Sequence, residues 1–157
     1  MRKQPGFTLV EVLVTLVVLA VGLLGLAALQ SVTLRSSNSA VYRSQATNLA
    51  YYIADCMRVN RGAAINGDYV ISPIPTPPAC TKSSTGSALS GATIALKDID
   101  AWQKTLACVL PQGTGGIGAV AQNGTSPALT YTVTITVQWD DSRGEILPQQ
   151  FAMTTNL

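Results

Sequence analysis

The sequence predicts an α+β fold in which one long N-terminal helix, whose first half can span a membrane, packs on a small antiparallel sheet. Two observations carry this prediction. An apolar block near the N-terminus lies in a segment without proline between Pro5 and Pro73, which allows one continuous helix. Near the C-terminus, apolar and polar residues alternate without exception from residue 129 to residue 139, which is the period of a strand.

The composition limits the chemistry that the chain can carry. Of its 157 residues, 47% are apolar, 11% are charged and none is histidine. Without histidine there is no Ser-His-Asp or Cys-His nucleophile and no histidine-ligated zinc site. Without Arg2 and Lys3, which precede the apolar block, basic and acidic residues are equal at eight each. We therefore expect no enzyme, no cofactor and no nucleic-acid partner.

The apolar block is long enough to cross a membrane. Residues 12–29 are 18 consecutive uncharged residues, which as a helix span about 27 Å of a hydrocarbon layer about 30 Å thick. Arg2 and Lys3 precede this run and a neutral stretch follows it, so the N-terminus is predicted to face the cytoplasm. A secretory signal peptide cut near residues 26–29 is the alternative, but the length of the run and the carboxylate of Glu11 argue against it.

A short string at the start of the apolar block is the most specific signal. A basic leader ends in Pro5 and Gly6, a large apolar residue, Phe7, follows, and Glu11 is fifth counting from Phe7. Gly6 lacks a Cβ, and with Pro5 it keeps the backbone extended and accessible to a protease. The string resembles the cleavage and methylation signature of the type IV pilin-like superfamily, which includes type IV prepilins and type II secretion pseudopilins.

The resemblance implies how the chain is processed and where it resides. A prepilin peptidase would cut between Gly6 and Phe7, remove residues 1–6 as a leader, and methylate the new amine of Phe7. The helix would remain in the inner membrane as a single span with a periplasmic head, and the subunit would later enter a pilus (fimbrium). The implied partners are the lipid membrane, the inner-membrane assembly platform, the major pilin and other minor pilins. The implied architecture is the type IV pilin fold.

Glu11 acquires a partner under this interpretation. A carboxylate in hydrocarbon is tolerated when it is paired, and the amine freed at Phe7 of a neighbouring subunit is a cation at nearly the same depth. The resemblance implies that this pairing sets the axial stagger of subunits in a filament. The alternative is that Glu11 reaches water at the membrane surface and has no role in assembly.

The helix is predicted to continue past its membrane half, residues 7–29, into an amphipathic half, residues 30–61, and to stop at Gly62. Its apolar residues recur at intervals of three or four: Tyr42, Ala46, Leu49, Ile53 and Met57. A helix over residues 7–61 would be about 80 Å long, so half of it must protrude from a domain of this size. Gly22 and Gly25 fit either close helix packing or a stretch that unwinds on assembly.

The head, residues 62–157, is predicted to hold a loop, a second helix and a sheet. Residues 62–96 are rich in Gly, Ser, Thr and Pro and predict a long surface loop, with one short strand near residues 69–71. Residues 72–93 of this loop are the expected partner-specific surface. Asp98 is a candidate cap for a helix that ends at Pro111 and whose apolar face is Ile99, Trp102, Leu106 and Val109.

The sheet is expected to be antiparallel. The alternating strand, residues 129–139, is followed by a turn over residues 140–144 and a returning strand within residues 146–156. An earlier strand, residues 117–122, is expected to join through Asn123 and Gly124.

Three patches in the head narrow the resemblance. The patches are residues 57–62, Trp102 with Leu106 and residues 110–113, and residues 137–144, and they resemble the PilV family of minor pilins. Membership of that family would imply a minor pilin that primes type IV pilus assembly, sits in the tip complex and helps to present a PilY-type adhesin, with roles in cell adhesion and twitching motility. GspI-type minor pseudopilins of type II secretion are the alternative, because they are built alike and prime a shorter filament.

Three cysteines in an oxidising compartment predict one disulfide and one free thiol. We favour Cys80 with Cys108, because this bond would fasten the irregular loop to the second helix. Cys56 lies near the apolar stripe of the long helix and is expected to be a packed thiol. With no histidine and no Cys-x-x-Cys, we expect no metal site.

Two close acidic pairs are the remaining candidates for chemistry. Asp98 with Asp100, and Asp140 with Asp141, could serve acid-base catalysis or bind calcium. Their positions favour a helix start and a solvated turn instead. Arg35, Arg43, Arg58 and Arg61 do not form one stripe, which argues against a DNA-binding face.

Overall fold

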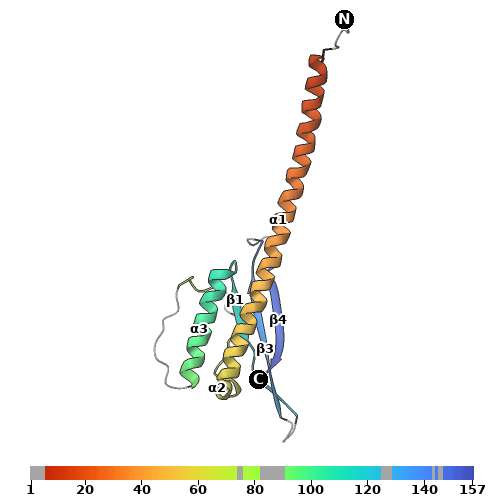
Figure 1. The fold of residues 1–157 in the computed structure, drawn as a ribbon. Coiled ribbons are helices and arrows are strands. Elements are labelled where there is room, and N and C mark those ends of the chain that lie inside the picture. Colours follow the sequence, from red (N-terminus) through yellow and green to blue (C-terminus); the bar gives the residue numbers. More distant parts are fainter. Residues whose placement is uncertain (1–5, 74–75, 82–90, 125–128, 143, 145–146) are drawn as a thin grey trace. The chain divides into compact units, whose positions relative to one another are not determined.

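The computed structural model describes residues 6–73, 76–81, 91–124, 129–142, 144 and 147–157 (Figure 1). They form two compact units, Met1–Ala40 and Val41–Leu157. The elements are α1 (Leu9–Val59), α2 (Arg61–Ile65), α3 (Gly91–Val109), β1 (Thr114–Ile117), β2 (Ala121–Asn123), β3 (Thr130–Trp139) and β4 (Gln149–Asn156). A long apolar N-terminal helix with a small antiparallel sheet confirms the predicted α+β fold of the pilin type.

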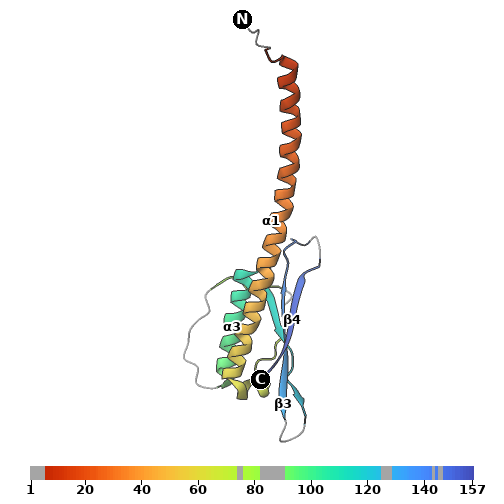
Figure 2. The ribbon, with the colours of Figure 1, turned by 45° about the vertical axis from the view of Figure 1, so that its right-hand side comes forward.

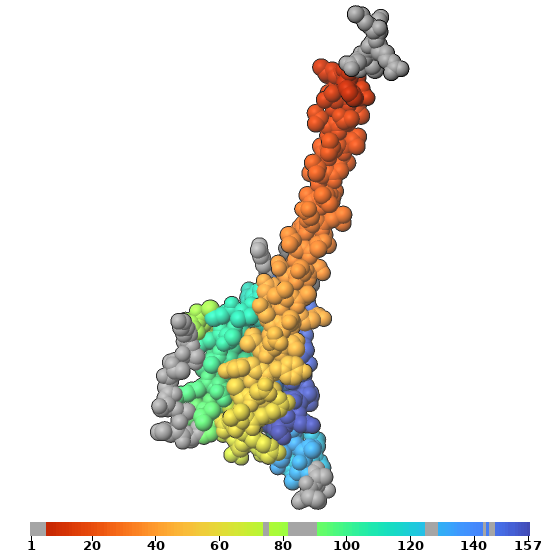
Figure 3. Space-filling model, in the orientation of Figure 1, coloured from red at the N-terminus to blue at the C-terminus, as the bar shows by residue number. Residues whose placement is uncertain are grey.

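The first unit consists of the apolar part of α1. Every described side chain from Gly6 to Asn38 is exposed, and Figure 3 shows the side chains of this part around a single helix. An 18-residue window of α1 has a mean hydropathy of 2.9, and α1 is the one helix in the described residues that is long and apolar enough to cross a membrane. Apolar surface on this scale requires lipid or other protein around it.

In the second unit, the remainder of α1 and the helix α3 pack on one face of the sheet (Figures 1 and 2). The predicted apolar stripe of α1 is confirmed, since Ile53 and Met57 are fully buried and Tyr42 and Leu49 pack against the core. The indole of Trp102 on α3 is buried and donates from Nε1 to the carbonyl of Leu49, 2.9 Å away. This bond ties the two helices together at their packed faces.

Strand β3 is the centre of the sheet. Strand β4 pairs with β3 antiparallel from Thr132↔Asn156 to Trp139↔Gln149. Strands β1 and β2 follow one another along the opposite edge, because Thr132 pairs with Ala121 of β2 as well as with Asn156 of β4. The predicted alternation holds, because one face of β3 is buried in the core through Val133, Ile135, Val137 and Trp139.

Strand β1 lies directly beneath α3, and its glycines make this possible. A Cβ on Gly115 would come within 2.8 Å of Leu106 Cδ1 and would also overlap the Trp102 ring. The buried carboxamide of Gln103 bonds both backbone groups of Gly115, with Nε2 donating to the carbonyl at 2.5 Å and Oε1 accepting from the N–H at 3.3 Å. The Gln103 side chain thus takes up the hydrogen-bonding groups of Gly115 that point away from β3.

The long helix ends differently from the prediction. Helix α1 stops at Val59, and Gly62 does not end it but lies inside the short helix α2. The break is at Asn60, whose φ of −104° and ψ of 47° leave the helical region. The Asn60 side chain donates to the carbonyl of Gly91 at 2.7 Å and to the hydroxyl of Tyr69 at 3.2 Å. Tertiary hydrogen bonds, which no local pattern reveals, therefore set the end of α1.

The long-loop prediction for residues 62–96 is wrong at both of its ends. Helix α2 opens the segment, Tyr69 is fully buried, and α3 begins at Gly91. Asp98 therefore lies within α3 and does not cap it; its carboxylate accepts a short hydrogen bond from the Tyr69 hydroxyl. Residues 74–75 and 82–90, which make up about half of the expected partner-specific surface over residues 72–93, lie outside the described residues.

The strands also differ in detail. The predicted strand over residues 117–122 is two strands, β1 and β2, and Ile71 forms an isolated bridge to Ile117 in place of a separate short strand. The turn after β3 begins with Asp140, whose Oδ1 accepts from the Ser142 N–H and Oγ at 2.8 and 2.7 Å. Residues 143, 145 and 146 of the predicted turn and returning strand lie outside the described residues.

Candidate functional site

The candidate site is the start of α1. Gly6, Phe7 and Thr8 precede the helix, and Glu11 lies in its first turn. The Thr8 side chain caps the helix, because its Oγ1 accepts from the Glu11 N–H at 3.3 Å. The Thr8 carbonyl accepts from the N–H groups of Glu11 and Val12 at 3.1 and 3.3 Å.

This cap was missed in the sequence, although the signal was present. Thr8 followed by Glu11 three positions later, ahead of an apolar run, is the Ser/Thr-x-x-Glu/Gln pattern of a helix N-terminus. A carboxylate in the first turn also interacts favourably with the positive end of the helix dipole. Glu11 therefore has a local role in addition to the assembly role that the resemblance implies.

The peptide bond between Gly6 and Phe7 is accessible. Phe7 is 84% exposed, and a Cβ on Gly6 would meet no described atom within 4 Å. Nothing in the described fold therefore protects this bond, and nothing in it requires glycine at position 6.

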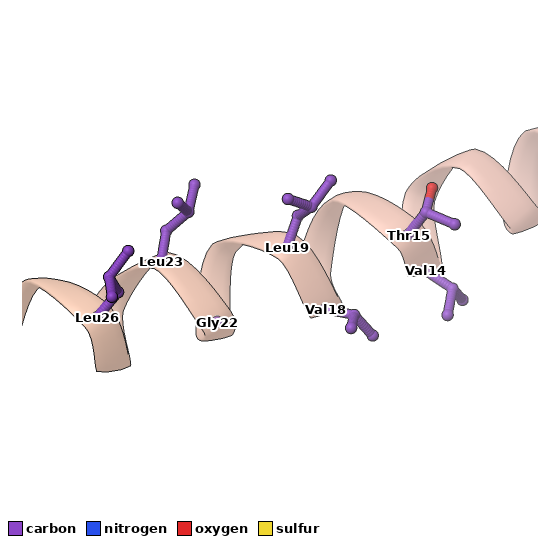
Figure 4. Close-up of a pocket in the computed structure, with 7 residues that line it drawn as sticks. All are labelled: Val14, Thr15, Val18, Leu19, Gly22, Leu23 and Leu26. Carbon is purple, nitrogen blue, oxygen red and sulfur yellow. The ribbon is translucent and has the colours of Figure 1, made fainter.

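The apolar face of α1 carries a shallow hollow of about 750 Å³. Figure 4 shows Gly22 without a side chain between Val18 and Leu26, with Leu19 and Leu23 along the other side of the hollow; the complete lining is Val14, Thr15, Val18, Leu19, Gly22, Leu23 and Leu26. The Thr15 hydroxyl is already bonded to the Val12 carbonyl at 2.8 Å. A lone helix face with no free polar group suits another apolar helix or lipid chains and offers no chemistry for catalysis. Gly22 and Gly25 are both helical here.

The cysteines form one disulfide. Cys80 is bonded to Cys108 near the end of α3, with their Cα atoms 4.8 Å apart, which is the pairing favoured from the sequence. Cys56 on α1 is free and half-buried. Burial, and next the nearby charge of Asp98, raise the pKa of the Cys56 thiol. Because the thiolate is the reactive form, Cys56 is a poor nucleophile at neutral pH.

The acidic pairs have structural partners. Asp98 accepts from Tyr69, and burial followed by this hydrogen bond raises the pKa of the Tyr69 hydroxyl. Asp100 forms an ion pair with Lys104 at 2.8 Å, and Asp140 holds its own turn. Among the described residues, no group of three or more Cys, Asp or Glu could hold a metal ion.

Comparison with known proteins identifies the N-terminal segment alone. Residues 1–27 match the family model described as the prokaryotic N-terminal methylation motif. No curated protein and no solved structure gave a match to the chain. The matched residues include Gly6, Phe7, Thr8 and Glu11 and most of the apolar face of α1. They support a type IV pilin-like or pseudopilin protein with a structural role, processed by prepilin peptidase and assembled with other pilins.

Proposed function

We propose that this chain is a minor pilin that primes type IV pilus assembly, sits in the tip complex and helps to present a PilY-type adhesin. The observation that carries the proposal is the methylation motif over residues 1–27, placed on an exposed apolar helix with a capped start. The three PilV-like patches of the head support the minor-pilin role over that of a major subunit.

The methylation motif supports processing just ahead of α1. Cleavage between Gly6 and Phe7 removes the leader and leaves Thr8, with its cap bond to Glu11, on the mature chain. The new N-terminal amine, methylated on Phe7, then stands at the start of the membrane helix. The apolar part of α1 remains in the inner membrane, with the methylated amine of Phe7 toward the cytoplasmic side and the head in the periplasm.

Assembly then places Glu11 against a neighbouring subunit. No described residue of the chain donates a hydrogen bond or an ion pair to the Glu11 carboxylate; the cap bond uses its backbone N–H. An ionised carboxylate is costly in hydrocarbon unless it is paired. The methylated amine of Phe7 in the adjoining subunit supplies that charge and fixes the axial position of one helix relative to the next.

The decisive experiment is the intact mass of the protein purified from bacterial membranes. A chain that begins at Phe7 and carries one added methyl group supports the proposal. A chain that begins near Leu29 would show that the apolar block is a discarded signal peptide, and an uncleaved chain would show that residues 1–27 do not act as a prepilin signal. Either of these masses would overturn the proposal.

The second candidate is a GspI-like minor pseudopilin of a type II secretion system. The same methylation motif favours it, because pseudopilins share this signature with pilins. Deletion of the gene separates the two. Loss of surface pili and twitching supports the pilus, whereas loss of protein secretion with pili intact supports the pseudopilin.

A further inference from the structure

The sheet of the head has one long open edge. In β4, the odd-numbered residues bond to β3, as the register and the 2.9 Å bond from the Leu157 N–H to the Tyr131 carbonyl establish. The backbone groups of the even-numbered residues, Gln150, Ala152, Thr154 and Asn156, therefore point away from the sheet. No backbone bond joins them to any described residue, and Figure 2 shows β4 as the outermost strand.

The opposite edge of the sheet is covered. The outward backbone groups of Gly115 are bonded by the Gln103 side chain. Those of Ile117 are bonded by the backbone of Ile71, at 2.8 and 3.0 Å. Strand β2, which continues this edge, has only three residues. The described residues thus satisfy one edge and leave the other as a row of donors and acceptors that no backbone group meets. Within this row the Asn156 carbonyl accepts a long bond, 3.5 Å, from Thr155 Oγ1.

Strand β4 lacks the features that normally prevent strand addition. Edge strands are commonly protected by charged residues, proline, bulges or short length. Residues Gln149–Asn156 contain no charge and no proline, and they pair with β3 through eight consecutive partners without a bulge. An edge of this kind accepts an extended peptide through backbone hydrogen bonds.

The surroundings of β4 define the chemistry of such a peptide. The side chains of Phe151 and Met153 are half-buried against the core and partly open at this edge. Arg58 of α1 reaches β4 by donating to Thr155 Oγ1 at 2.5 Å, so Tyr51, two turns earlier on the same helix face and 53% exposed, lies on the β4 side. The middle of this side of the edge is therefore apolar, and the polar side chains of Gln149 and Thr155 lie at its two ends.

The other side of the edge is polar without charge. Its exposed side chains are Gln150, Ala152, Thr154 and Asn156, and they continue into the Thr-rich outer face of β3 through the 3.1 Å contact between the hydroxyls of Thr154 and Thr134. Arg58, which donates to Thr155 on β4, is also paired with Asp55 at 2.6 Å. Strand β4 itself therefore carries no charged side chain for an acidic or basic segment to recognise.

We propose that the β4 edge binds an extended segment of a second, different protein, which joins the sheet as an additional strand. The segment is about seven residues long, matching the open stretch of β4. Its side chains alternate between apolar residues, which cover Phe151, Met153 and Tyr51, and uncharged polar residues beside Ala152 and Thr154. This inference rests on the head alone and does not require filament assembly.

A strand of this pattern already exists in the chain and serves as the probe. A synthetic peptide with the sequence of β3, Thr130–Trp139, flanked by lysines for solubility, is titrated into the full chain in detergent micelles. Residue-resolved amide exchange should slow at Gln150, Ala152, Thr154 and Asn156. The amides of Phe151 and Met153, which already bond to β3, should not change.

Two proline substitutions test the edge directly. Ala152→Pro removes an outward donor without removing a bond to β3, and should weaken peptide binding about tenfold. Gln122→Pro makes the same change at the outer edge of β2 and should leave binding unchanged. If the Ala152→Pro variant fails to fold, Ala152→Lys replaces it in the test. This variant retains the backbone N–H but places a charge on the edge strand, and it should also weaken peptide binding.

Three results would overturn the inference. The first is no change in exchange at the four outward amides, and the second is equal weakening by Ala152→Pro and Gln122→Pro. The third is protection of these amides without peptide that increases with protein concentration, because a second copy of this chain would then occupy the edge. None of these results bears on cleavage at Gly6, so failure here and failure of the pilin proposal are separable.

Discussion

The two compact units of this chain expose opposite kinds of surface. In the first unit the exposed side chains are mostly apolar, and its candidate role follows from a short string around Gly6, Phe7 and Glu11. In the second unit a core of apolar side chains is buried between the helices and the sheet, and the feature that singles out its surface is a row of backbone groups along β4. A covalent processing signal is local and can be read from sequence, whereas an open sheet edge exists only once the strands have paired.

The largest effect is expected from Gly6→Val, which should abolish leader cleavage in the first unit and leave the second unit unchanged. A Cβ at this position meets no described atom, so folding should be unaffected. A branched side chain should block the peptidase, and we expect essentially complete retention of the leader, measured as the intact mass of the membrane-bound protein. Gly25→Ala is the matched control, because a Cβ there also meets no atom within 4 Å. Normal cleavage of the Gly6→Val chain would contradict the assigned site.

The complementary experiment destabilises the second unit and asks whether leader cleavage in the first unit is affected. Trp102→Ala deletes a fully buried ring and its bond to Leu49, and should destabilise the head by about 3–5 kcal/mol. Thermal unfolding of the detergent-solubilised chain measures this loss, while leader cleavage should be unaffected. Leu96→Ala is the control, since Leu96 is 67% exposed on the same helix, and its cost should stay within about 0.5 kcal/mol. Impaired cleavage in the Trp102 variant would show that the units are coupled.

Helices and strands that depend on local sequence patterns were predicted correctly, whereas boundaries that depend on tertiary contacts were not. The apolar run, the stripe of α1 and the alternation in β3 are local periodicities, and the structure has a helix or a strand at each. The processing string is a local motif that ends in the first turn of α1. Asn60 as the end of α1, Asp98 inside α3 and the split between β1 and β2 depend on contacts with Gly91, Tyr69 and the α3 side chains. Composition alone does not encode such contacts, which explains why the glycine- and proline-rich segment was predicted as a loop.

A smaller effect is expected at the helix cap. Thr8→Ala removes the side-chain oxygen that accepts from the Glu11 N–H and leaves the bond of that N–H to the Thr8 carbonyl. The loss of a cap costs about 1 kcal/mol, so exchange of this amide should accelerate by up to about fivefold. Thr8→Ser should restore protection. Thr15→Ala is the control, because its hydroxyl donates to a carbonyl and no N–H loses an acceptor. Equal acceleration in the Thr8 and Thr15 alanine variants would show that the bond is not a cap.

The smallest effect concerns the free thiol of the head. Burial is the main cause that raises the pKa of Cys56, the charge of Asp98 is the next, and that of Asp55 is a lesser one. Because a raised pKa leaves less thiolate at a given pH, alkylation by iodoacetamide at pH 8 should be slower than for an exposed cysteine and should increase as the pH rises.

Removing one carboxylate at a time tests the order of these causes. Asp98→Asn withdraws the larger electrostatic contribution, which lowers the pKa of Cys56, increases the thiolate fraction and should accelerate alkylation a few-fold. Asp55→Asn removes an equal charge from the neighbouring position on α1 and should have the weaker effect, although it also breaks the ion pair with Arg58. A larger acceleration in the Asp55 variant would mean that the thiol senses the surface of α1 more than the Tyr69–Asp98 contact behind it. The reactivity of Cys56 would then depend on an exposed carboxylate of α1 more than on the packed interior of the second unit.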